Sequence, residues 1–461
     1  MLPPGPRRLP ILGNLIDISR DMIHVKARDW SRMFGTEVIS LRVLGNVIIV
    51  LNSARAVSDV FDKRGSNYSD RPDLPMLVDL MGWDWTFALM RYGPRWKEHR
   101  RVFHTHLNHN AKEHQQLQGS IVLELLRLLW HYPGNYPDHL QHYTGHIILK
   151  RIYGHAVKDY YDPYIQLVKE ASASASEAAV PGAFFVDLFP SLKYIPEWIP
   201  GAGFKRKARL WRKLSTAMVN VPYDTTKANF LKGEANSCFV ATCLEANAMR
   251  CLAGEDVLLT EELIKNTAAV AYAAGADTTA ATLKTFLLAM CLYPEIQQRA
   301  QAELDTLLCL DGHLERLPTF SDRKNLPYLN AIVKEVLRWI PVLPFAVPHR
   351  SMEDDTYSGF LIPKDSTVIG NAWAILHDEA MFPSPDVFSP ERFLDGTDIL
   401  DPADIGAFGF GRRSCAGKEM ALDTIWIAIA SILAIFNVSR VKDKLGNEVV
   451  PEIKVNFGAI R

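Results

Sequence analysis

The longest helix that the sequence predicts, over residues 260–292, constrains the fold of this 461-residue chain more than any other feature. Thr260 can cap the helix, and Glu261 and Glu262 lie in its first turn, where the helix dipole favours acidic side chains. At a rise of about 1.5 Å per residue, this helix is roughly 50 Å long, which is the width of a whole domain. We therefore expect it to run through the interior of the molecule.

Shorter elements complete the predicted fold. A second helix over residues 326–340 ends where Pro341 forbids its continuation. Two short segments rich in β-branched residues, 47–51 and 360–369, predict strands. Most of the remaining chain has helical patterning interrupted by Pro and Gly, and the sequence has no internal repeat. We therefore expect a single, mainly α-helical domain with small β-sheets.

Composition and charge exclude several classes of protein. Hydrophobic residues make up 48% of the chain and charged residues 22%, which is the balance of a globular protein rather than a disordered one. The net charge of −1 provides no long-range attraction for nucleic acid. The six cysteines form no CxxC pair and have no zinc-site spacing, so we expect free thiols in a reducing compartment.

A proline-dense segment opens the chain. Residues 2–10 read Leu-Pro-Pro-Gly-Pro-Arg-Arg-Leu-Pro, which favours an extended tether because proline disrupts helices. We expect residues 1–20 to be a tether that follows a membrane anchor absent from this sequence, and residues 21–461 to form the domain. The nearest candidate for a membrane span, 263–292, contains Lys265, Asp277 and Lys284, which argue against it.

The segment 408–417, Phe-Gly-Phe-Gly-Arg-Arg-Ser-Cys-Ala-Gly, carries the most specific chemistry. Its glycines allow sharp turns and a close approach of the backbone to a flat ligand. The helix predicted to follow it directs N–H groups and a positive dipole end at Cys415, which lowers the pKa of a thiol. A buried, inert cysteine is an alternative. A phosphate-binding loop does not fit, because no Gly-Lys-Ser/Thr ending is present, and a cysteine phosphatase needs its arginine after the cysteine.

This segment resembles the haem-binding signature of the cytochrome P450 family, Phe-Gly-x-Gly-x-Arg-x-Cys-x-Gly, with every fixed position filled. The resemblance, which is closest to the microsomal type found in fungi, implies the cytochrome P450 fold, with haem b between a long central helix and the cysteine loop. It also implies that Cys415 is the axial thiolate of the haem iron, which favours cleavage of the O–O bond. Arg413 is then expected to contact a haem propionate, and Phe408 to pack beside the sulfur. The cofactor contacts implied within the signature are Phe408, Gly411, Arg413 and Gly417.

The long predicted helix contains Ala-Gly-Ala-Asp-Thr-Thr at 274–279. A mid-helix glycine and a buried acid both cost stability, so their joint presence needs a reason. A solvated helix face with an incidental glycine is one explanation. The segment also resembles the oxygen-activation motif of the P450 family. That resemblance implies that the helix loosens at Gly275 and that Asp277 and Thr278 relay protons to oxygen.

Glu335 and Arg338 are spaced i and i+3 on the second predicted helix and therefore share a face. Alone, such a pair is usually a solvated surface ion pair. Arg392 lies in a Pro-Glu-Arg-Phe segment that precedes the cysteine loop. The family resemblance implies that Glu335, Arg338 and Arg392 form a buried network with a structural role, holding this loop under the haem.

Trp96 and Arg100 lie one helical turn apart, and both are hydrogen-bond donors suited to a carboxylate. An ordinary amphipathic helix explains the same pattern. The resemblance makes them propionate ligands together with His349, for which Arg350 is an alternative. For the histidine-rich segment that follows Arg100 we expect a solvated face rather than a metal site, because no acid or fourth ligand is near. It comprises His104, His106 and His109.

The resemblance implies a monooxygenase that uses O₂ and two electrons to oxidise an apolar small molecule, as in secondary or xenobiotic metabolism. The chain has no dinucleotide fingerprint, so the electrons are expected from a separate NADPH-cytochrome P450 reductase, with cytochrome b5 as a second donor. We expect a monomer that binds no nucleic acid. The charges expected to dock the reductase are Lys97, Arg101, Arg412 and Lys418.

A membrane contact is predicted for the segment 189–201, which is rich in aromatic residues and proline, with a buried connection as the alternative. The basic residues that follow it are Lys205, Arg206, Lys207 and Arg209. The expected location is the cytoplasmic face of the endoplasmic reticulum membrane. The segments expected to line an apolar substrate pocket are 74–90, 270–274 and 342–347.

Three rival functions are compatible with parts of the sequence. A haem-thiolate enzyme that rearranges peroxides needs neither O₂ nor a reductase, but it has less need of Asp277 and Thr278. A haem-bound sensor or carrier shows no turnover, and a helical scaffold binds no haem. Dependence of turnover on NADPH and O₂ distinguishes these functions from a monooxygenase.

Overall fold

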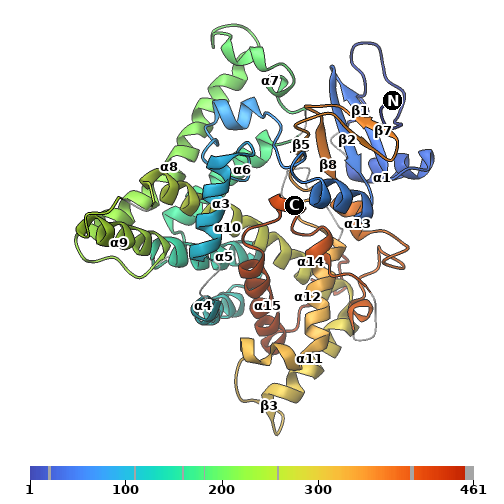
Figure 1. Cartoon of the computed structure of the whole chain (residues 1–461). Helices are drawn as coiled ribbons and strands as arrows, with labels where there is room; N and C mark the ends of the chain where they lie inside the picture. The colour runs from blue at the N-terminus through green and yellow to red at the C-terminus, as the bar shows by residue number, and fades with distance from the viewer. Residues whose placement is uncertain are drawn as a thin grey trace.

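Long helices form most of the molecule, and a four-stranded sheet lies to one side of them (Figure 1). The structure is a computed structural model that describes residues 1–18, 22–107, 111–157, 160–180, 182–256, 259–394 and 399–451. The predominance of helix confirms the predicted fold class.

The helical elements differ widely in length. The long α-helices are α1 Ile23–Phe34, α3 Pro94–Leu107, α4 Ala111–His131, α5 Tyr136–Tyr153, α6 Pro163–Ala178, α8 Gly203–Leu231, α9 Phe239–Leu252, α10 Glu261–Leu292, α11 Pro294–Leu308, α12 Pro327–Trp339 and α15 Lys418–Ile435. The short α-helices are α2 Ala54–Val57, α7 Phe185–Leu188, α13 Ala372–Leu376 and α14 Pro402–Ile405. The π-helical segments are η1 Ser58–Lys63 and η2 Pro75–Leu80, and the 3₁₀ segments are η3 Pro133–Asn135, η4 Pro190–Tyr194, η5 Phe320–Asn325, η6 Pro390–Phe393 and η7 Gly411–Arg413.

Helix α10 confirms the long helix predicted over residues 260–292. Thr260 caps it by accepting a hydrogen bond from the backbone N–H of Leu263 (3.2 Å). The helix passes through two hydrophobic cores. Its first part, up to Ala276, packs with α3, α5, α6, α8 and α9, whereas its second part, from Ala280, packs with α4, α5, α11, α12 and α15. Residues 277–279 therefore lie where the two cores meet.

Helix α10 is continuous through Gly275, so the expected loosening at this residue is wrong. A Cβ atom at this position would lie 2.7 Å from Cδ1 of Ile148 on α5. The glycine thus gives α5 room to pack closely against α10, which accounts for its presence without a break in the helix.

The main sheet has the strand order β1-β2-β8-β5. Strands β1 and β2 are antiparallel, β2 and β8 are parallel, and β8 and β5 are antiparallel. Two further pairs, β3 with β4 and β6 with β7, form small antiparallel hairpins. The strands are β1 Val38–Val43, β2 Asn46–Leu51, β3 Cys309–Leu310, β4 His313–Leu314, β5 His349–Arg350, β6 Asp355–Tyr357, β7 Phe360–Ile362 and β8 Thr367–Gly370.

The predictions for the strands are partly confirmed. Strand β2 matches the segment 47–51, and α12 matches the second predicted helix, but the prediction of one strand over 360–369 is wrong. Strands β7 and β8 occupy that segment and belong to different sheets. Pro363 has no N–H for a strand ladder, and Asp365 has a φ of 65°. The chain therefore turns between β7 and β8.

The proline-rich segment lies along the edge of the sheet. The Ser40 backbone N–H of β1 donates to the carbonyl of Pro4 (2.9 Å), and its hydroxyl donates to the carbonyl of Pro3 (2.5 Å). The extended conformation that proline imposes therefore places its carbonyls beside β1. Among the described helices, none combines the length and apolar character needed to cross a bilayer.

Candidate active site

A cavity lies between the middle of α10 and the loop that precedes α15. Thr278 of α10 lines one side of it, and Phe408 and Cys415 of the loop line the other. The Cys415 side chain has exposed surface even though it lies inside the molecule, because it faces this cavity. The structure thus brings the cysteine loop opposite the long central helix, as the sequence predicts.

The backbone of the loop explains its glycines. The Cys415 N–H donates to the carbonyl of Phe408 (2.8 Å), which closes the turn. Gly409 and Gly411 have φ values of 74° and 56°, in the region that favours glycine. A Cβ atom at Gly411 would also lie 2.4 Å from the carbonyl oxygen of Phe61, so a larger residue clashes with backbone there. Gly411 thus shapes the loop without lining the cavity.

The surroundings of the Cys415 sulfur act on its protonation in opposite directions. Burial raises the pKa of the Cys415 thiol. The backbone N–H of Gly417, directly before α15, donates to the sulfur and opposes this rise, and so do the positive charges of Arg100 and Lys418. These donors stabilise a thiolate, and a metal cation on the sulfur would stabilise it further.

Three arginines line the cavity, and we call Arg71, Arg100 and Arg413 the cavity arginines. None of the described Asp or Glu residues lines it. Asp70, whose negative charge acts on Arg413, forms ion pairs with Arg91 (2.8 Å) and Arg350 (3.5 Å). Buried cations without a carboxylate partner are costly, so the cavity has the charge to receive an anionic ligand.

Arg413 and Arg71 are held by backbone carbonyls. The Arg413 guanidinium donates to the carbonyls of Ser69 (2.7 Å), Phe87 (3.0 Å) and Met90 (2.7 Å), which leaves two of its five N–H groups for a ligand. Burial lowers the pKa of Arg413 to about 10. Arg71 donates in the same way to the carbonyls of Ala88, Val347 and Pro348. The sequence does not predict a role for Arg71, because a single arginine before a proline has no distinguishing local pattern.

Trp96 and Arg100 both lie on α3 and line the cavity, and their binding of a propionate stays a prediction. The Arg413 guanidinium lies over the Trp96 ring, 4.4 Å from its centroid. Within the described part of the chain, Arg100 has no hydrogen-bonded partner. Burial lowers the pKa of Arg100, and Cys415 opposes that change. Of the three cavity arginines, Arg100 is therefore the one whose donors are all free for a ligand.

His349 also lines the cavity, from strand β5. Its Nδ1–H donates to the carbonyl of Tyr68 (2.6 Å). Burial, followed by the charge of Arg71, lowers the pKa of His349 well below its ordinary value, so the ring is neutral. Nε2 of a neutral ring with this tautomer is an acceptor. Donation from His349 to a carboxylate therefore requires the ring to gain a proton, which a nearby carboxylate favours.

Thr278 and Asp277 point to different surroundings. Thr278 lines the cavity, and its hydroxyl donates to the carbonyl of Ala274 (2.8 Å). Asp277 does not line the cavity; its carboxylate accepts hydrogen bonds from Gln141 of α5 (2.7 Å) and Ser172 of α6. Burial raises the pKa of Asp277, and these two donors oppose the rise. The two residues are adjacent in sequence, but only Thr278 can contact a ligand in the cavity directly.

Glu335, Arg338 and Arg392 lie together, and we call them the α12 network. Glu335 and Arg338 have no exposed surface and are joined by two hydrogen bonds of 2.7 and 2.8 Å, and Arg392 lies 3.2 Å from the same carboxylate. Arg338 also donates to the carbonyls of Leu376 and Val387. The network thus joins α12 to the chain that leads to the cysteine loop, and its role in holding that loop under the haem stays a prediction.

The segments expected to line the substrate pocket do so only in part. Val270, Ala271 and Ala274 line the cavity, as do Val342, Leu343, Ala346 and Val347. The expectation for 74–90 is wrong for most of its length, because only Phe87 and Ala88 line the cavity while η2 packs in the core beside α8. In the histidine-rich segment, His104 is exposed and His106 half-buried, whereas His109 lies outside the described residues.

Comparison with known proteins identifies the family. The family model described as Cytochrome P450 matches residues 3–451. A cytochrome P450 monooxygenase of Armillaria gallica is 61% identical, over all of this chain and 89% of that protein. Cytochrome P450 monooxygenase 98 of Postia placenta is 44% identical, over 98% of this chain and 86% of its own. A tryptamine 4-monooxygenase of Psilocybe cyanescens is 38% identical, over 97% and 88%.

The chain therefore belongs to the cytochrome P450 family and is a monooxygenase similar to fungal members of that family. The family holds haem b through an axial cysteine thiolate. The residues of the cavity fit this cofactor. Cys415 presents its sulfur to the cavity. Haem b carries two negatively charged propionates, and the cavity arginines provide positive charge to balance them.

Proposed function

We propose that this monooxygenase inserts one atom of O₂ into a neutral, apolar small organic molecule, with electrons from NADPH delivered by a separate reductase. The balanced reaction is RH + O₂ + 2 e⁻ + 2 H⁺ → ROH + H₂O. The observation that supports the substrate class is the lining of the cavity beside Thr278. It is formed by Val270, Ala271, Ala274, Val342, Leu343 and Val347.

The residues of the chain position the reactants and move protons. Haem b, when bound, supplies the redox-active iron for the activation of O₂. Cys415 would hold that iron, and Trp96, Arg100, His349 and Arg413, which line the cavity, would bind the propionates. The Thr278 hydroxyl, which donates to the carbonyl of Ala274, offers its oxygen to the cavity as a hydrogen-bond acceptor, and Asp277 supplies protons to the cavity through water.

One relative bears on the choice between neutral and cationic substrates. The tryptamine 4-monooxygenase acts on tryptamine, as its name says, and tryptamine carries an amino group that is protonated at neutral pH. A buried ammonium requires a carboxylate or several acceptors. The described residues place no Asp or Glu in the lining of this cavity. We therefore favour neutral substrates such as terpenoids, sterol-like ring systems or aromatic natural products, in secondary or xenobiotic metabolism.

Turnover by the reconstituted haem protein tests this function. With NADPH and a fungal cytochrome P450 reductase, we expect products that carry one oxygen from ¹⁸O₂ and are formed from neutral apolar compounds rather than from amines. A red-shifted absorption band of the reduced protein under CO checks thiolate ligation separately. Product formation from a peroxide without NADPH or O₂ would replace this proposal with the peroxide-rearranging function.

The reductase contact is proposed on the face beside α3. Lys97, Arg101 and Arg412 are exposed, and Lys97 and Arg412 both contact Tyr92. Lys418 forms an ion pair with Asp404. We expect Lys97→Glu to weaken the salt-sensitive rate of reduction by reductase, and electron transfer from cytochrome b5 is tested on the same variant. Unchanged reduction rates would remove this face from consideration.

A membrane contact is proposed for the surface around η4. Tyr194 and Trp198 are 78% and 82% exposed, and Phe185 of α7 is 65% exposed. Lys193 and the basic start of α8 provide positive charge beside these rings. Exposed aromatic side chains next to basic residues suit a lipid interface, here the cytoplasmic face of the endoplasmic reticulum. Trp198→Ser should reduce binding to anionic lipid vesicles.

A further inference from the structure

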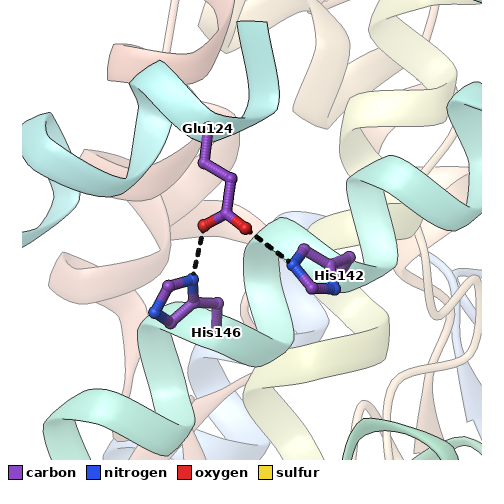
Figure 2. A group of neighbouring side chains, drawn as sticks. All are labelled: Glu124, His142 and His146. Atoms are coloured by element: carbon purple, nitrogen blue, oxygen red, sulfur yellow. Dashed lines mark hydrogen bonds and ion pairs between the residues drawn. The ribbon is translucent and has the colours of Figure 1, made fainter. Parts of the chain in front are cut away.

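Three side chains that can bind a metal meet between α4 and α5 (Figure 2). His142 and His146 are spaced i and i+4 and therefore share one face of α5, and Glu124 of α4 extends between them. Their ligand atoms all lie within 4.8 Å of one another. None of the three lines the active-site cavity.

The two rings point at the same carboxylate. Nε2 of His142 lies 3.1 Å from Oε1 of Glu124, and Nδ1 of His146 lies 2.8 Å from Oε2. The cluster therefore offers two imidazole nitrogens and an anionic oxygen in one place.

The two histidine rings of the cluster are largely buried, whereas the glutamate is partly exposed to solvent. The side chains of His142 and His146 are 4% and 13% exposed, whereas that of Glu124 is 39% exposed. The His142 ring also stacks on Tyr160, with 5.6 Å between centroids. The ligand nitrogens are thus held in place by packing, and water can reach a fourth position from the Glu124 side.

We propose that Glu124, His142 and His146 bind a divalent transition metal ion, with Zn²⁺ as the best match. Two imidazoles and one carboxylate with water as the fourth ligand form a common zinc coordination set. Ligand atoms around tetrahedral Zn²⁺ lie about 3.3 Å apart, given metal–nitrogen bonds of about 2.0 Å. Small side-chain rotations bring the three present atoms to that spacing. On binding, each ring keeps one proton, on the nitrogen that does not face the metal.

A metal at this place would fasten α4 to α5 close to the active site. Gln141, which precedes His142, donates to the Asp277 carboxylate (2.7 Å). Thr144, between the two histidines, donates to the carbonyl of Ala276 on α10 (2.6 Å). The site therefore lies on the same helix turns that hold the middle of α10. Binding of a metal at this site requires neither the proposed substrate nor the reductase.

Calorimetric titration with ZnCl₂ tests the site. The titrated form is the haem protein from which all metal ions other than the haem iron have been removed. Cys415 is bound to iron in this form and does not compete for zinc. We expect one saturable site, and a rise in the melting temperature on addition of Zn²⁺. His142→Gln and His146→Gln each remove a ligand and should weaken the affinity by about tenfold or more. His146 is the more exposed of the two, so its variant serves if the buried His142 variant does not fold.

His155→Gln is the matched control, because His155 forms a single pair with Asp162 (2.7 Å) outside the cluster. It should bind Zn²⁺ as the unaltered protein does. The haem absorption spectrum verifies the fold of every variant. Absence of saturable binding at millimolar Zn²⁺, or equal affinity in the cluster variants and the control, overturns the proposal.

Discussion

The α12 network and the cavity arginines both contain buried arginines, but they differ in how the positive charge is compensated. In the α12 network, Glu335 supplies a carboxylate within 3.3 Å of both arginines. Arg71 and Arg413 of the cavity have only backbone carbonyls as hydrogen-bond partners, and no acid lines their cavity among the described residues. The arginines of the α12 network thus have their carboxylate partner within the chain, whereas the cavity arginines need an anionic ligand as their partner.

This difference separates stabilisation of the fold from binding of the cofactor. A buried ion pair that loses one partner leaves an uncompensated charge, which destabilises the protein itself. A buried cation whose partner belongs to a ligand contributes mainly to the affinity for that ligand. The two groups should therefore respond differently to substitution, in unfolding for the α12 network and in cofactor retention for the cavity arginines.

The largest effect on activity is expected at Cys415, which lines the same cavity as the cavity arginines. Cys415→Ala should abolish both the red-shifted CO band and product formation, because no other described thiol faces the cavity. Far-UV circular dichroism should remain unchanged, since the side chain contacts a ligand rather than the core. Cys309→Ser, outside the cavity, is the control and should retain the band. Survival of the band in the Cys415 variant contradicts the ligand assignment.

Glu335→Gln should produce the largest loss of stability. The substitution keeps the shape of the side chain but leaves Arg338 and Arg392 without a carboxylate, at a cost of about 3–5 kcal/mol in the free energy of unfolding. Urea denaturation followed by circular dichroism measures this. Glu379→Gln breaks an exposed ion pair with Arg32 (3.0 Å) and should cost no more than about 0.5 kcal/mol. Equal losses in the free energy of unfolding for the two substitutions would show that the α12 network stabilises the fold no more than an exposed ion pair does.

Arg100→Leu should weaken the retention of haem with little effect on unfolding. A hydrogen bond to a charged group contributes about 1.5–3 kcal/mol, so haem transfer to a scavenging globin should accelerate about 10–100-fold. Arg101→Leu, on the exposed face of the same helix, is the control and should not alter haem transfer. If Arg100→Leu destabilised the fold as Glu335→Gln does, the distinction between the two groups would fail.

The smallest effect is expected at Thr278. Thr278→Ala removes a hydroxyl that lines the cavity, so haem retention and stability should hold while the product formed per NADPH falls about tenfold and hydrogen peroxide increases. Thr285→Ala removes a buried hydroxyl on the same helix that bonds to Ala281 and does not line the cavity. Unchanged coupling in the Thr278 variant, or the same loss in both, contradicts the proposed role.

Local patterns in the sequence predict α10, with its cap at Thr260, and the cysteine loop, where glycine is required at Gly411 by its φ angle and by the neighbouring backbone. They are less informative where contact between distant segments decides. The sequence predicts a loosened helix at Gly275, but the reason for this glycine is the approach of Ile148. It also predicts one strand over 360–369, which a turn divides in the structure.

The amino-acid sequence by itself determined which residues can perform the chemistry, because a signature such as the one around Cys415 depends on neighbours in the chain. Only the tertiary structure decided which charges lack a partner. Arg71 reaches the cavity, and Glu124 meets His142, through the packing of helices and loops that are separated in sequence. The spacing of residues along one helix or loop contains no information on what the opposing element brings to it.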